Sequence, residues 1–134
     1  MSFAVDPIRL PRAPEFQSVF RVLADALPQM VWLTREDGTI EYMNRAWTRF
    51  TGLDQTEVSP EDWRRAVHPN DFDHAVAAFS RARDANEGIS IEFRLRGRDG
   101  AYRWFRSRSE VLWDADGRAF RRLGSAVDVD DTKK

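Results

Sequence analysis

The first apolar pattern along the chain has the period of a helix. Apolar side chains recur every three or four residues, and Pro28 ends the run, which predicts an amphipathic helix over residues 15–27. Residues 1–14 hold three prolines, and because proline fixes φ and restricts the preceding residue, they predict an extended arm. The apolar stripe of the predicted helix consists of Phe16, Val19, Phe20, Leu23 and Leu27.

The rest of the chain alternates between strand-like and helix-like patterns. Asp-Gly pairs at 37–38, 99–100 and 116–117 each separate two runs of strand-forming residues, and glycine accepts the positive φ that a tight hairpin turn requires. Between the first two pairs, apolar residues at helical spacing form shorter pieces that end at Gly52 and Gly88. The order is helix, two strands, several helices, three strands, which predicts an α+β domain with mostly antiparallel pairing.

One predicted strand is apolar on both faces at its start. Tyr102, Trp104 and Phe105 lie there together, so the sheet needs a cover on its outer face as well as on its core face. The first helix is the obvious cover, either from the same chain or from a second copy. We therefore expect a homodimer in which the helix stripe meets the outer sheet face near Phe120.

Composition narrows the class of protein. The 134 residues suffice for one domain, cysteine is absent and the net charge is -1. These values exclude thiol chemistry and give no reason to expect nucleic acid as a partner. No apolar run reaches the ~20 residues of a membrane span, and the first residues lack a secretory signal. We expect a soluble, cytoplasmic domain.

The tests for chemistry are mostly negative. His68 and His74 flank Asp71 and Asp73, but acids at the start of a helix are favoured by its free N–H groups, so we expect no metal site. No nucleophile elbow, phosphate-binding loop or dinucleotide fingerprint is present. The chain is therefore not expected to be an enzyme, with a small pocket enzyme as the remote alternative.

Five stretches, taken in order, resemble the motifs of the PAS/PAC sensory-box family, in particular its PAS fold-3-like subgroup. The resemblance covers roughly residues 20–130, with the PAS domain at 28–130. The stretches are Asp37–Trp47, Phe50–Gly52, Val67–Asp71, Asp99–Trp104 and Gly124–Val129.

The resemblance implies a five-stranded antiparallel sheet with helices packed on one face around a small cavity. It also implies a sensory or regulatory module of a signal-transduction protein, such as a two-component system, that acts on a C-terminal effector. The effector is expected beyond Lys134, as a histidine kinase or nucleotide cyclase, with residues 131–134 beginning the linker. Asp128 matches the family's output motif, whereas Asp130 replaces the usual threonine.

The same resemblance supplies pocket candidates. No cofactor is expected, and the alternatives are a small organic ligand or a haem bound through His74. A packed core predicts most of the same apolar residues, and Asn44 is also placed to cap a helix. The pocket candidates are Asn44, Trp47, Phe50, Phe72, Val76, Phe79, Ile91 and Phe93.

Overall fold

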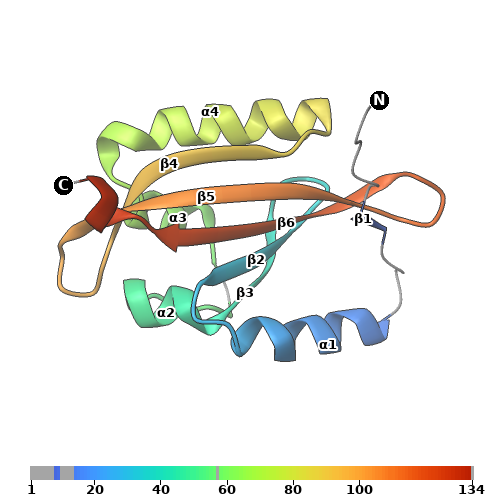
Figure 1. Cartoon of the computed structure of the whole chain (residues 1–134), viewed down its shortest axis with the longest axis horizontal. Coiled ribbons are helices and arrows are strands. Elements are labelled where there is room, and N and C mark those ends of the chain that lie inside the picture. Colours follow the sequence, from blue (N-terminus) through green and yellow to red (C-terminus); the bar gives the residue numbers. More distant parts are fainter. Residues whose placement is uncertain (1–7, 10–13, 57, 134) are drawn as a thin grey trace.

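The computed structural model describes residues 8–9, 14–56 and 58–133. Figure 1 shows a sheet with α4 along one side and α1 along the other. The elements are β1 (Ile8–Arg9), α1 (Pro14–Asp25), β2 (Met30–Arg35), β3 (Ile40–Met43), α2 (Arg45–Thr51), α3 (Pro60–Ala66), α4 (Pro69–Ala85), β4 (Ile89–Arg96), β5 (Tyr102–Trp113), β6 (Ala119–Asp128) and the 3-10 helix η1 (Asp130–Lys133).

The five expected strands form one antiparallel sheet in the order β4-β5-β6-β2-β3. The structure adds a short sixth strand, β1, which pairs in parallel with β5 through Ile8 and Leu112. Pairing between β4 and β5 begins only at Ile89 and Ser109, so β1 uses the stretch of β5 that β4 leaves open. Most of the expected arm at 1–14 lies outside the described residues.

Local signals set most of the helix ends. Gly52 ends α2 with φ 78°, and Ser59 begins α3 with a capping box to Asp62. The long helix α4 ends earlier than expected, because Asn86 caps it with φ 53° ahead of Gly88. Asn tolerates this left-handed conformation better than most residues, which leaves Gly88 to lead into β4.

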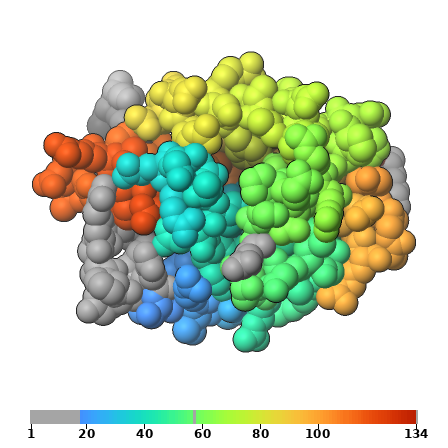
Figure 2. All heavy atoms as spheres, turned by 180° about the vertical axis from the view of Figure 1, so that it is seen from behind, coloured from blue at the N-terminus to red at the C-terminus, as the bar shows by residue number. Residues whose placement is uncertain are grey.

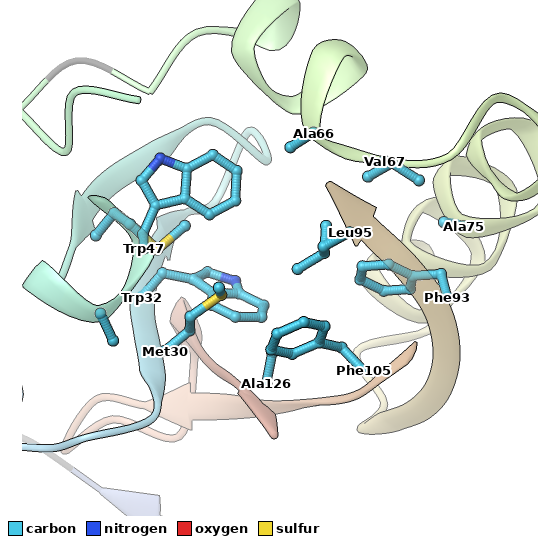
Figure 3. Close-up of a cluster of buried hydrophobic side chains, with 12 residues drawn as sticks. Met30, Trp32, Trp47, Ala66, Val67, Ala75, Phe93, Leu95, Phe105 and Ala126 are labelled. Carbon is cyan, nitrogen blue, oxygen red and sulfur yellow. The ribbon is translucent and has the colours of Figure 1, made fainter. Parts of the chain in front are cut away.

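Each face of the sheet carries its own apolar core. The larger one lies between the sheet and helices α2, α3 and α4, and Figure 3 shows Trp32 and Trp47 on one side of it and Phe93 and Phe105 on the other. The smaller core lies on the opposite face under α1. Its buried members are Ala24, Val31, Leu33, Tyr42, Leu112 and Phe120.

One side of α1 packs on the sheet of its own chain. Phe20 packs edge-on against Tyr42 with ring centroids 5.7 Å apart. The hydroxyl of Tyr42 donates to Asp25 Oδ1 at 2.5 Å, and burial together with this carboxylate raises the pKa of Tyr42. Asp25 also accepts from the backbone N–H of Arg45, so the end of α1 is fixed to β3 and to the start of α2.

An ion pair joins α4 to β4. The Arg94 side chain donates to both carboxylate oxygens of Asp71, at 2.9 Å and 2.8 Å, and its backbone N–H donates as well. The two side chains are 27% and 14% exposed. These hydrogen bonds lower the pKa of Asp71. Asp71 therefore does more than favour the helix start, because it ties α4 to the sheet edge.

Asp71→Asn should lower the free energy of unfolding at neutral pH by about 1–3 kcal/mol, since it removes charge-assisted hydrogen bonds from a partly buried pair. A carboxylate whose pKa is lowered by folding stabilises above its unfolded pKa of about 3.9. That stabilisation is lost as the pH falls through the lower folded pKa. The difference in the free energy of unfolding between wild type and Asp71→Asn should therefore shrink as the pH falls from about 5 toward 3.

Urea unfolding of both proteins over this pH range provides the measurement. The control is Asp73→Asn, an exposed carboxyl on the same helix. A gap for Asp71→Asn that stays constant down to pH 3 would show that the ion pair contributes no pH-dependent stability.

Candidate functional site

A half-open cavity of about 330 Å³ lies between the inner sheet face, α3, α4 and the turn of the β2–β3 hairpin. Figure 2 shows a hollow between the hairpin in cyan, α4 in yellow and the green segment that contains α3. The lining residues are Trp32, Thr34, Asp37, Gly38, Thr39, Ile40, Val58, Ser59, Pro60, Trp63, Val76, Phe79, Ser80, Arg83, Ser109 and Arg122.

A glycine on β6 gives the Trp32 ring its place beside the cavity. Gly124 is paired with Trp32 on β2 and with Ser109 on β5. A Cβ at Gly124 would lie 2.1 Å from the Trp32 ring, so only glycine allows the indole to lie flat on the sheet. Ser109 continues this shallow floor, and the cavity opens above it.

Aromatic rings form one wall. Trp63 on α3 packs edge-on against Phe79 of α4 and Phe93 of β4, with ring centroids 6.3 Å and 5.5 Å apart. Trp63 also stacks on Trp47, with ring centroids 6.2 Å apart. Rings held in this way by their neighbours present a rigid apolar surface to the cavity.

The opposite end of the cavity is cationic. Arg122 on β6 is only 9% exposed, and it donates to Ser109 Oγ at 3.0 Å and to the carbonyl oxygens of Ala82 and Glu87 at 3.5 Å and 2.5 Å. Burial, together with the charge of Arg83, lowers the pKa of Arg122. The side chain is held mainly by the carboxyl end of α4, where a helix favours positive charge.

Arg83 approaches the same cavity from the last turns of α4. Its guanidinium lies over Gly38 in the hairpin turn, so closely that a Cβ there would meet Nη1 at 2.0 Å. Asp37 lines the cavity beside it, but its Oδ1 accepts from the N–H and hydroxyl of Thr39, which lowers the pKa of Asp37. The mouth is thus formed by a hydrogen-bonded turn and a guanidinium.

The expected pocket residues divide between the cavity and the core. Val76 and Phe79 line the cavity. Trp47 and Phe93 are buried in the inner core, and the other apolar candidates pack against that core without lining the cavity: Phe50, Phe72 and Ile91. His74 is exposed on α4 and does not line the cavity, so this geometry gives no support to a haem ligand there.

Asn44 is a structural residue of the described chain. It stands at the N-cap position of α2, but its side chain makes no cap hydrogen bond. Its Oδ1 accepts from Val31 N at 2.9 Å, and its Nδ2 donates to the carbonyls of Ala24 and Gln29. The fully buried amide therefore joins α1, β2 and the start of α2.

Sequence reasoning missed several cavity residues. Trp32, Trp63, Arg83 and Arg122 were not among the candidates, although all four line the cavity. For Arg122 a signal existed: it stands two residues before Gly124, and therefore on the same face of β6 as the glycine beneath Trp32. Only the strand register shows that this shared face is the inner one.

The end of β6 forms a second polar cluster. Arg103 Nε donates to Asp128 Oδ2 at 2.5 Å, and its Nη1 and Nη2 lie 3.9 Å and 3.7 Å from Asp130 and Asp131. Asp130 Oδ1 also accepts from Trp104 N at 3.1 Å. The aspartate at the family's usual threonine position thus holds η1 against β5.

The remaining part of α1 is apolar and exposed. Leu23 is 62% exposed, Val22 is 72% exposed and Val19 is also exposed. The helix ends at Asp25, earlier than expected, so the exposed Leu27 lies just beyond it. The expected stripe is thus divided, because Phe20 packs on its own sheet. The side chain of Phe16 lies outside the described residues.

The described residues contain neither a cluster of metal ligands nor a membrane-spanning helix. No three His, Cys, Asp or Glu side chains lie close enough together to hold a metal ion. No described helix is long and apolar enough to cross a membrane.

Comparisons with known proteins agree with this architecture. The chain is 31% identical to the uncharacterized protein y4lL of Sinorhizobium fredii over 115 residues, which cover 86% of this chain and 14% of that protein. It is 26% identical to the peroxide stress-activated histidine kinase mak1 of Schizosaccharomyces pombe over 129 residues, 87% of this chain and 8% of that protein. The chain therefore spans a small part of these relatives.

A solved structure shows the same fold. The PAS domain of a protein from Colwellia psychrerythraea superimposes with a TM-score of 0.67 at 18% identity, over 87% of this chain and 98% of that one. The family model described as PAS fold matches residues 40–126, a range that includes α2, α3, α4 and most of the sheet. The chain belongs to the PAS-fold family.

Proposed function

We propose that this PAS domain is the sensory module of a cytoplasmic signal-transduction protein, and that a small organic molecule in the cavity controls the segment that follows β6. The observation that carries the proposal is the position of β6. One strand supplies Arg122 to the cavity and, six residues later, Asp128 to the Arg103 cluster. A displacement of β6 at the cavity is therefore passed directly to the start of η1.

The proposed output is an effector attached beyond Lys134, of the histidine kinase or nucleotide cyclase type. The similarity to a histidine kinase, of which the match spans 8%, supports an effector of this type in the same protein. We assign the present chain no catalysis of its own and no resident cofactor. Its contribution is the coupling between cavity occupancy and the C-terminal segment.

The proposed working form is a homodimer in which α1 meets a second copy of itself. Val19, Val22 and Leu23 are exposed at helical spacing on α1, and Leu27 is exposed just beyond its end. An apolar patch that meets itself across a two-fold axis is self-complementary. Phe20 packs against the core on the opposite side of α1, and this contact keeps the helix on its own sheet. The second copy thus adds to this packing and does not replace it.

A cavity-filling variant tests the coupling without a known ligand. Ser80→Phe places a ring in the cavity from α4, and it should change hydrogen exchange at the amides of Val129 and Thr132, which donate to Trp104 and Val129 carbonyls. This change in exchange should vanish in an Arg103→Gln background, because Arg103 pairs with Asp128 at the end of β6. Hydrogen exchange followed by mass spectrometry provides the readout.

Ala77→Phe is the matched control, since it adds the same ring to the exposed face of α4. Equal exchange at residues 119–133 in wild type, Ser80→Phe and Ala77→Phe would contradict the proposed relay.

The dimer is tested separately by Leu23→Glu. A charge in the apolar patch should convert the dimer to a monomer, because the carboxylate loses its water in the interface. Light scattering coupled to size exclusion measures the mass, with Ala77→Glu as the control that keeps the dimer. A wild type that is monomeric at millimolar concentration would exclude this interface in the isolated domain.

A further inference from the structure

We infer that the cavity selects an organic anion, whose flat apolar body lies against the aromatic wall and whose carboxylate or similar oxyanion pairs with Arg83 and Arg122. This inference rests on the proposed function and names the chemical class of its ligand. The two ends of the cavity differ in character: Trp63 and Phe79 form an apolar wall, and the two guanidinium groups approach from α4 and β6.

Arg122 has capacity for a further partner. A guanidinium has five N–H donors, and three hydrogen bonds from Arg122 are satisfied by Ser109 Oγ and the carbonyls of Ala82 and Glu87. None of these acceptors is a carboxylate. A charge that is this deeply buried is costly unless it is paired, and the carboxyl end of α4 compensates only in part. An anion in the cavity would complete the pairing.

Arg83 adds a second positive charge at the same place. In the part of the chain that the structure describes, its side chain takes part in no hydrogen bond or ion pair, and it is partly buried. It lies near enough to Arg122 for its charge to disfavour the protonated form of that residue. Two like charges that face one cavity repel each other, and an anion between them removes the repulsion.

Two carboxylates near this pair, Asp37 and Glu110, each have another neighbour or contact. The Oδ1 of Asp37, at the cavity mouth, is engaged by Thr39 in the hairpin turn. Glu110 attracts Arg122, but its side chain is 50% exposed and lies 4.0 Å from Arg108. The adjoining groove is also rich in arginine: Arg35, Arg118 and Arg121 line it with Arg83 and Arg122, and Glu36 is the one acidic residue among the described residues of that lining. Arg121 is paired with Glu41.

The volume limits the size of the ligand. About 330 Å³ is at the lower end of small-molecule pockets, which suits a molecule of one or two rings. A fused two-ring carboxylate has the required shape and charge. 2-Naphthoate and its neutral counterpart 2-naphthamide therefore form a matched pair of probes.

The test is titration calorimetry of the purified chain with each probe, supported by quenching of tryptophan fluorescence from Trp32 and Trp63. Wild type should bind 2-naphthoate at least about tenfold more tightly than 2-naphthamide, as expected for one charge-assisted pairing. Arg83→Gln should reduce this preference roughly tenfold and leave 2-naphthamide binding unchanged. Arg83 is the better position to replace, because removing Arg122 would also remove hydrogen bonds that hold the end of α4 to the sheet.

Arg81→Gln is the control, since Arg81 is an exposed cation two residues away on α4 and should leave both affinities unchanged. Arg122→Lys keeps the charge and should keep part of the preference for the acid. Equal binding of the two probes, or an unchanged preference in Arg83→Gln, would overturn the inference and leave the sensory relay intact. Binding of neither probe would also overturn it, and the relay would then be judged by the exchange response of Ser80→Phe alone.

Discussion

The buried guanidinium of Arg122 joins the parts of this domain on which its function depends. It lies on β6, bonds to Ser109 of β5 and reaches carbonyl oxygens at the end of α4. Phe79 of α4 packs on Phe93 of β4, and Arg122 adds hydrogen bonds between β6 and the end of α4. The same side chain therefore helps to hold the helix to the sheet and gives the cavity a positive end.

Local sequence signals predicted the framework well. Each Asp-Gly turn contains a glycine at positive φ, at positions 38, 100 and 117, because glycine adopts this conformation without a steric cost. The capping box at Ser59 and the glycine end of α2 follow from short-range rules of the same kind. The family resemblance then supplied the five-stranded antiparallel sheet with helices packed on one face, which no local rule contains, and it is confirmed by the observed sheet and by the match to the PAS fold.

The cavity was less accessible to sequence reasoning, since it depends on contacts between distant segments. Phe93 and Trp47 carry the apolar character of pocket residues, yet their neighbours bury them completely. Asn44 looked like a helix cap because of its position, but its amide bonds to Ala24 in α1 and to Gln29 and Val31 around the start of β2, which approach it only after folding. Arg122 looked like an ordinary strand arginine until the strand register placed it on the inner face beside Gly124.

Nuclear magnetic resonance of the arginine side chains can decide whether Arg122 is a buried, carboxylate-free cation that faces the cavity. Its Nε–H proton should exchange with water much more slowly than that of Arg108, whose side chain is 67% exposed. On addition of 2-naphthoate, the Arg122 signal should shift while the Arg108 signal stays in place. An Arg122 proton that exchanges as fast as that of Arg108 and does not respond to the anion would contradict this structure of the site.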